Sequence, residues 1–312
     1  MIFIQGVEDI PSGLSYPCLT IGNFDGAHLG HQALFNKTVT LAHKHSGTSI
    51  AITFHPHPTR VLRPEIPLKL ISTLDQKVKF ISYYGIDILI CIPFTKEFAS
   101  TSPTQFVKDI LIKKIGIKEL VVGYDYSFGR NREGNINFLK TQGVINNFKV
   151  HVVPPVIVKS LIVSSTLVRE LIAEGKVEQA AQMLGRPFEI QGVVQQGMKR
   201  GGPLLGFPTA NIYLKEDQLG PKTGVYAVIV QVGEQNYKGV MNVGYNPTFE
   251  GEQLSAEVHI LEFNQDIYGK TIDIKLIKRL REEKTFSGPQ ELAAQIKKDI
   301  SNALAALEHI II

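Results

Sequence analysis

Two histidines stand three residues apart in residues 20–31, which read Thr-Ile-Gly-Asn-Phe-Asp-Gly-Ala-His-Leu-Gly-His. The apolar run before this segment predicts a strand, and the pattern after it predicts a helix from about residue 28 to 45. A helix start offers backbone N–H groups and partial positive charge, and glycines allow close approach to a ligand. We expect His28 and His31 to share the first turn and to donate hydrogen bonds to a triphosphate without competing with the backbone donors.

Two other interpretations fit this histidine pair. Histidines at this spacing also occur as ordinary polar helix residues or as metal ligands, but no Glu completes the H-E-x-x-H pattern of a zinc protease. The whole string, placed between a strand and a helix, favours a nucleotide site. Its candidate binding residues are Gly22, Asn23, Phe24, Asp25, Gly26 and Gly30.

Two further segments fit a nucleotide site. Residues 123–129 follow a predicted strand, where open α/β sheets place ligands. Ser164, Ser165 and Thr166 begin another predicted helix, with Arg169 on its first turn, so hydroxyls and a guanidinium would form a second anion clamp. Taken alone, such a Ser/Thr cluster is also typical of a plain helix N-cap.

The C-terminal part contains a glycine-rich stretch, residues 192–206. It lacks the G-x-x-x-x-G-K-[ST] pattern, so a P-loop kinase is excluded, and the protein-kinase motifs are absent as well. A glycine-rich hairpin with Gly197, Gly201 and Gly206 could still wrap a nucleotide through backbone contacts, although ordinary turns have the same composition.

A sharper string follows at residues 205–211, Leu-Gly-Phe-Pro-Thr-Ala-Asn. A Pro turn followed by an Asn cap is the structural alternative for this string. Further on, residues 256–261 alternate as a strand, which places Glu257 and His259 on the same face. A carboxylate on a strand is otherwise commonly a solvent-facing residue.

With H-x-G-H at 28–31, S-S-T-x-x-R at 164–169 and G-F-P-T-A-N at 206–211, the chain resembles the prokaryotic bifunctional riboflavin kinase/FAD synthetase family over nearly its whole length. The resemblance implies that the N-terminal half adenylylates FMN and that the C-terminal half phosphorylates riboflavin, both with ATP and Mg²⁺. Two positions depart from the family: Leu167 replaces a basic residue of many members, and Gly202 replaces an Arg.

In the N-terminal half, the resemblance implies roles for single residues. His28, His31 and Arg169 would stabilise charge on the triphosphate and on the leaving pyrophosphate. Asp125 and Phe128 would lie on the nucleotide and flavin sides. The Pro-flanked loop of residues 54–58, with His57, also matches the family.

In the C-terminal half, the resemblance implies that Thr209 and Asn211 bind Mg²⁺ and phosphate oxygens. Phe207 and Pro208 belong to the same signature, and Glu257 would be the catalytic base. Residues 266–269 and 280–286 also match, and the latter would help to close the flavin pocket, with Arg281 as the candidate.

The elements that must position these residues change character near Gly185-Arg186-Pro187. Before it, strands and helices alternate, which predicts a doubly wound α/β domain of the nucleotidyltransferase type with a parallel sheet, residues 1–185. After it, short β-rich runs and one final helix predict a six-stranded antiparallel Greek-key β-barrel, residues 186–312. The predicted strands are residues 17–21, 49–54, 86–92, 119–122, 150–153, 188–194, 225–232, 237–243, 256–261 and 271–277; the predicted helices include 75–84, 102–115 and 289–307.

Composition agrees with a globular enzyme of small molecules. The 312 residues are 44% hydrophobic and 20% charged, and the net charge of +4 is a weak bias towards anions rather than a nucleic-acid footprint. Two cysteines lie in apolar runs, which favours core packing. The absence of a signal peptide and of a long apolar run predicts a cytoplasmic protein without membrane or nucleic-acid partners, a monomer or weak homo-oligomer. Retention of only one activity, or a non-catalytic flavin sensor, are the alternatives.

Overall fold

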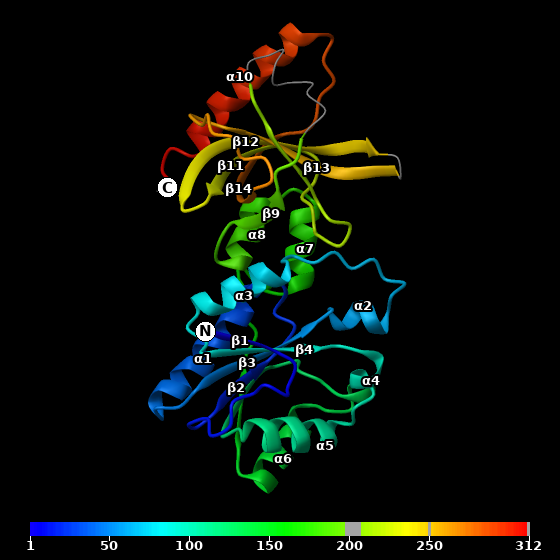
Figure 1. Ribbon diagram of the computed structural model, residues 1–312, viewed down its shortest axis with the longest axis vertical. Helices are drawn as coiled ribbons and strands as arrows, with labels where there is room; N and C mark the ends of the chain where they lie inside the picture. The colour runs from blue at the N-terminus through cyan, green and yellow to red at the C-terminus, as the bar shows by residue number, and fades with distance from the viewer. Residues whose placement is uncertain (197–206, 249–250, 311–312) are drawn as a thin grey trace. The chain divides into compact units, whose positions relative to one another are not determined.

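The computed structural model describes residues 1–196, 207–248 and 251–310, coloured along the chain in Figure 1. The predicted site residues Gly197, Gly201 and Gly206 lie outside this part, as does Gly202. The chain forms two compact units. The first comprises Met1–Leu68 and Thr73–Ser165, and the second comprises Lys69–Ser72 and Thr166–Ile312.

The first unit is built on a parallel sheet whose six strands all lie within residues 1–165. Their order across the sheet is β1-β4-β3-β2-β5-β6, and every neighbouring pair is parallel. Five of the strands were predicted; β1 was not, because its apolar run, residues 1–4, is only four residues long and of the residues in β1 only Ile4 is buried. The bounds are β1 Ile2–Gln5, β2 Cys18–Ile21, β3 Ser49–His55, β4 Ile88–Pro93, β5 Glu119–Gly123 and β6 Lys149–Val153.

Helices cover both faces of this sheet, which confirms the doubly wound prediction. On one face, α1 (Leu29–Lys44) and α3 (Leu74–Tyr83) pack Phe35 and Phe80 against Leu89. On the other face, α5 (Pro103–Gln105) continues into the π-helical η2 (Phe106–Ile115), which packs with α6 (Ile136–Asn146). The shorter elements are η1 Asp25–Ala27, α2 Pro58–Leu62, α4 Lys96–Ala99, η3 Arg130–Arg132, β7 Ile157–Val158 and β8 Leu161–Ile162.

The strand order reverses direction at β2. From β2 the chain proceeds through β3 and β4 to one side, and it then returns to place β5 and β6 on the other side. In open α/β sheets ligands bind outside the carboxyl ends of the strands at such a reversal. The loops that leave β2 and β5, residues 22–28 and 124–129, therefore border the expected crevice.

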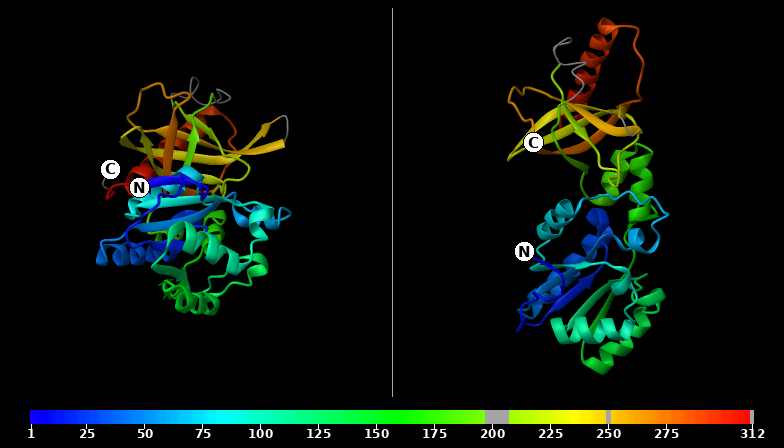
Figure 2. Two further views of the ribbon diagram at one scale, coloured as in Figure 1. Left: turned by 60° about the horizontal axis from the view of Figure 1, so that its bottom comes forward. Right: turned by 45° about the vertical axis from the view of Figure 1, so that its right-hand side comes forward.

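The second unit contains an antiparallel sheet with six strands in its described part, in the order β10-β13-β12-β11-β14-β9. The order β10-β13-β12-β11 is a Greek key, and a bridge between Gln195 and Asn211 brings the two edges together, so the sheet curls as Figure 2 shows. The bounds are β9 Phe188–Val193, β10 Ala210–Tyr213, β11 Gly224–Val232, β12 Gln235–Thr248, β13 Gly251–Ile260 and β14 Thr271–Arg281.

In the described part of the second unit, three helices accompany this sheet. The final helix α10 (Pro289–Ala306) buries Ala303 against Val225 and Ala227 of β11. The helix α8 (Val177–Leu184) packs on β9 and β14, and α7 (Ser165–Ala173) precedes it. Among the described helices, none combines the length and the apolar character that crossing a bilayer requires.

Both cysteines belong to the first unit and are buried free thiols, as the sequence predicted. Burial raises the pKa of the Cys18 thiol to about 11, with a further contribution from the charge of Glu119. Burial likewise raises the pKa of Cys91, although the charge of Lys77 opposes it.

Candidate functional site

The loop that leaves β2, residues 22–28, is called the histidine loop below. Its backbone enters the left-handed region at Phe24 (φ 50°), Gly26 (φ 77°) and Ala27 (φ 40°). For a residue with a Cβ this conformation carries roughly 1–3 kcal/mol of strain, which persists only where the surroundings hold it. The Phe24 ring is fully buried against Phe35, so it is one of the groups that hold the loop.

Side chains from outside the loop also tie down its backbone. Three carbonyl oxygens each accept one such hydrogen bond: Thr53 Oγ1 donates to Asn23 at 3.1 Å, Ser165 Oγ to Asp25 at 3.0 Å and Gln32 Nε2 to Ala27 at 2.9 Å. The structure thus brings Ser165, from the second predicted clamp, to the histidine loop. Because these carbonyls are engaged with the protein, they are not directed at an anion in the crevice.

The two histidines lie together, as predicted. Their rings stack with centroids 3.6 Å apart and an interplanar angle of 18°. A Cβ at Gly30 would lie only 3.1 Å from the His28 ring, so glycine accommodates the stack. One expectation was wrong: His28 is the N-cap of α1, and its Nδ1 accepts the His31 N–H at 3.4 Å, so it does compete for a backbone donor.

The loop that leaves β5 presents Asp125 on the surface and Phe128 at the edge of the core. The Phe128 ring contacts the rings of Phe106, Tyr126 and Phe138. It is half-buried, so one part of the ring packs on the protein while the rest remains accessible.

The remaining predicted residues of this half have local partners. His57 is the N-cap of α2 and accepts the Thr59 N–H at 3.2 Å. Ser164 precedes α7, and Thr166 lies exposed on its first turn. Arg169, which belongs to the second unit, donates from Nε to the Lys69 carbonyl at 2.9 Å.

Lys77 was not identified from the sequence. It lies on α3 with 6% of its surface exposed, and its Nζ donates to Thr53 Oγ1 at 3.4 Å. Burial lowers the pKa of this ammonium, while the charge of the Asp25 carboxylate opposes the shift. The available signal was its position in the helix, because Phe80 and Ile81, three and four residues on, are core residues.

In the second unit the predicted kinase residues are aligned by strand register. Asn211 on β10 is paired directly with Glu257 on β13, and Glu257 is paired on its other side with Asn242 on β12. Directly opposed side chains share one face of a sheet, so the three polar groups form a row across it.

The residues predicted to hold Mg²⁺ fit that ion. Asn211 is 7% exposed, and its Nδ2 donates to the Thr209 carbonyl at 3.3 Å, which orients the amide. Mg²⁺ is commonly held by one or two protein groups together with substrate phosphates. No cluster of three or more His, Cys, Asp or Glu side chains that could cage a metal occurs within the described ranges.

A cavity of about 370 Å³ opens beside Thr209. It is lined by Val258 and Ile260 of β13 and by residues 263–268, so apolar and polar groups both face it. The adjoining signature segment is fixed by His259, whose Nδ1 donates to the Pro208 carbonyl at 2.8 Å and whose ring meets that of Phe207 edge-on.

In the segment 280–286, Arg281 and Glu283 make contacts that the sequence did not indicate. Arg281 forms a bidentate ion pair with the buried Asp299 of α10 at 2.7–3.1 Å, so its guanidinium ties β14 to the final helix. Glu283 instead reaches over β12: a Cβ at Gly244 would lie 2.5 Å from its Oε1. Gly244 is two residues from Asn242, which places the Glu283 carboxylate on the face that carries Glu257.

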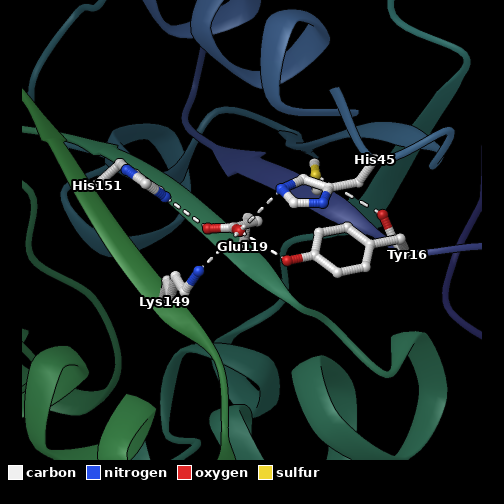
Figure 3. Close-up of polar contacts among 6 residues, drawn as sticks. Tyr16, His45, Glu119, Lys149 and His151 are labelled. Carbon is white, nitrogen blue, oxygen red and sulfur yellow. Dashed lines mark hydrogen bonds and ion pairs between the residues drawn. The ribbon is translucent and has the colours of Figure 1, made fainter. Parts of the chain in front are cut away.

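A second polar cluster surrounds Glu119 at the amino end of β5, the end opposite to the crevice (Figure 3). The Glu119 side chain is 2% exposed and accepts from Tyr16 Oη at 2.8 Å and His151 Nε2 at 2.5 Å, with His45 and Lys149 within 3.9 Å. Burial by itself would raise the pKa of Glu119, but the hydrogen bonds from His151 and Tyr16 and the nearby charges outweigh it, so this pKa is lowered. Since Glu119 begins β5, the cluster lies away from the crevice.

Comparisons with known proteins divide the chain in the same order as the motifs. The sequence model of the FAD synthetase family matches residues 13–167. The sequence model of the riboflavin kinase family matches residues 184–307.

Relatives similar to this chain span nearly its whole length. Bifunctional riboflavin kinase/FMN adenylyltransferases are 38% identical in Buchnera aphidicola subsp. Schizaphis graminum, over 96% of this chain and 97% of the relative, and 35% identical in Escherichia coli K12, over 96% of each. A crystal structure described as a macrolide-efflux protein from Streptococcus pneumoniae has a TM-score of 0.86 at 33% identity and covers 97% of this chain and 99% of that one.

Proposed function

Because the chain belongs to the bifunctional riboflavin kinase/FMN adenylyltransferase family, we propose that residues 1–185 adenylylate FMN and that residues 186–312 phosphorylate riboflavin. The family is that of an enzyme with both activities, and both family models match. The alternatives of a single retained activity and of a non-catalytic flavin sensor are therefore not supported. We further propose that the enzyme is cytoplasmic, where its co-substrate ATP is made.

For the adenylyl transfer we propose that an FMN phosphate oxygen attacks the α-phosphorus of ATP while the bond to the β-phosphate breaks and pyrophosphate leaves. The attacking phosphate is already ionised, so no general base is needed. Catalysis then consists of positioning and charge stabilisation. His28, His31 and Arg169 are the groups that would stabilise the charge on the departing pyrophosphate. Three carbonyls of the histidine loop already accept hydrogen bonds from protein side chains, and this supports an anion site at the carboxyl ends of the strands.

For the kinase reaction we propose that the riboflavin 5′-hydroxyl attacks the γ-phosphorus of ATP, that its proton passes to Glu257 and that ADP leaves. Thr209 and Asn211 would hold Mg²⁺ together with the phosphates, and the bound ion would neutralise part of their charge. The cavity beside Thr209 would take the nucleoside of ATP. The observation that carries this proposal is the register that sets Asn211 directly opposite Glu257.

One chromatographic assay tests the division of labour. With riboflavin, ATP and Mg²⁺, the full chain is expected to produce FMN first and then FAD. The fragment 186–312 is expected to produce FMN only, because it keeps the six antiparallel strands and the whole kinase signature. A folded fragment that leaves riboflavin unchanged would contradict the proposed boundary and the kinase assignment.

A further inference from the structure

Lys77 is a buried cation that has no role in either of the two mechanisms proposed above. It projects from α3, which packs against η1 in the histidine loop. The charge of Asp25 in the loop opposes the lowering of the Lys77 pKa that burial causes. Asp25 is 2% exposed, so its carboxylate lies in the interior rather than on the crevice surface, where the sequence had placed it among the binding residues.

A chain of hydrogen bonds links Lys77 to the loop backbone. Lys77 Nζ donates to Thr53 Oγ1 at 3.4 Å, and Thr53 Oγ1 donates to the Asn23 carbonyl at 3.1 Å. A hydroxyl has a single proton and an ammonium can only donate. When Lys77 donates to Thr53, the hydroxyl proton is therefore directed at Asn23, next to the strained Phe24.

We propose that Lys77 is a positioning residue for adenylyl transfer: acting through Thr53 and Asp25, it holds the histidine loop in the left-handed conformation that presents His28 and His31 to the triphosphate. The inference rests on the proposed function of this loop. It assigns Asp25 to the support of the loop rather than to direct contact with the ligand. Small displacements of catalytic groups have large effects on rate, so support from behind the loop acts on kcat.

The test compares matched variants of the full chain in the FMN-to-FAD assay. Lys77→Met keeps the side-chain length, and Thr53→Val keeps the shape while removing the hydroxyl. Each is expected to lower kcat for FAD formation roughly tenfold to a hundredfold. Riboflavin phosphorylation in the same molecules should be unchanged, since it belongs to the other half.

The controls separate positioning from a general loss of structure. Thr53→Ser keeps the hydroxyl and should therefore keep kcat for FAD formation near the wild-type value. Lys79→Met alters an exposed lysine of α3, the helix that carries Lys77, and should leave kcat unchanged. The double variant Lys77→Met with Thr53→Val should lose less than the product of the two single losses, because part of the effect of Lys77 passes through Thr53. Should Lys77→Met prove insoluble, Thr53→Val against Thr53→Ser decides the matter.

Normal FAD formation by Thr53→Val, or equal losses in Thr53→Val and Thr53→Ser, would overturn the inference. Multiplicative losses in the double variant would also overturn it, since they would indicate that Lys77 acts independently of Thr53. Failure of the proposed function would look different, because His31→Ala would then leave FAD formation intact.

Discussion

The two halves of this chain place their reactive groups by different means. In the first unit, the groups lie on loops at the carboxyl ends of parallel strands, and a strained backbone is held by side chains behind it. In the second unit, Asn211, Glu257 and Asn242 lie within paired strands, where register alone brings them into one row. The first site therefore depends on distant supports, whereas the second depends on correct strand pairing.

The largest expected effect is the loss of FAD formation, with the kinase site left intact. His31→Ala together with Arg169→Ala should abolish FAD formation, because removing charge-stabilising donors typically lowers the rate by about 10²–10³ each. FMN formation from riboflavin should stay nearly unchanged, and both products can be followed in one chromatogram. Near-normal FAD synthesis by the double variant would refute the roles given to His31 and Arg169.

The next largest expected effect is a loss of riboflavin phosphorylation, with the adenylylation site left intact. The 5′-hydroxyl must lose its proton during attack, and general-base assistance is typically worth about 10²–10⁴-fold. Glu257→Gln should lower FMN formation by about 10² or more, with riboflavin binding largely kept. The same variant should convert supplied FMN to FAD normally. Wild-type riboflavin phosphorylation would show that Glu257 is only a residue of the strand face.

A smaller expected effect concerns Glu283, which lies on the same face of the sheet as the row of Asn211, Glu257 and Asn242. Glu283 places an acceptor over Gly244 on the face of Glu257, where the hydroxyls of a flavin ribityl chain could donate to it. Glu283→Gln should raise KM for riboflavin about tenfold, in line with the loss of one hydrogen bond to a charged group. Glu282→Gln is the matched control, because that neighbour contacts Lys222 and Arg279 instead. Equal KM values in the two variants would exclude this role for Glu283.

The smallest effect concerns acid and the first unit. The lowered pKa of Glu119 means that the carboxylate adds stability above the ordinary glutamate value of about 4.3, and that this stability is lost as pH falls through the folded pKa. Glu119→Gln should therefore lower the melting temperature of the first unit at pH 7 and weaken its dependence on pH below about 4. Calorimetry at both pH values checks this, and an unchanged pH dependence in the variant would argue against it.

The sequence predicted most of the architecture because its patterns are local. Five strands of the parallel sheet are mainly apolar segments that alternate with helix patterns, and those of the second unit are short β-rich runs between turns, so both sheet types followed from the sequence. Strand β10, only Ala210–Tyr213, was missed, although the signature residue Asn211 lies on it. The segment is short, and it becomes a strand through pairing with β13, which no local pattern shows.

Individual site residues were harder to predict where their partners lie far away in the sequence. Arg281 looked like a flavin contact, but its partner Asp299 lies eighteen residues on, in the final helix. Lys77 was not singled out, because its partner Thr53 belongs to another element. The His28 cap was missed for a local reason: the extended backbone of His28 turns its ring back onto the helix start.

The two buried thiols allow the opening of the first unit to be followed over time by thiol labelling. Both cysteines of the chain, Cys18 and Cys91, lie within the first unit, and their raised pKa values keep them protonated and unreactive while that unit is closed. A thiol reagent added to the native protein will therefore react only when the parallel sheet opens. The labelling rate then measures the local opening of the adenylylating half, and unfolding of the kinase half leaves no label of its own.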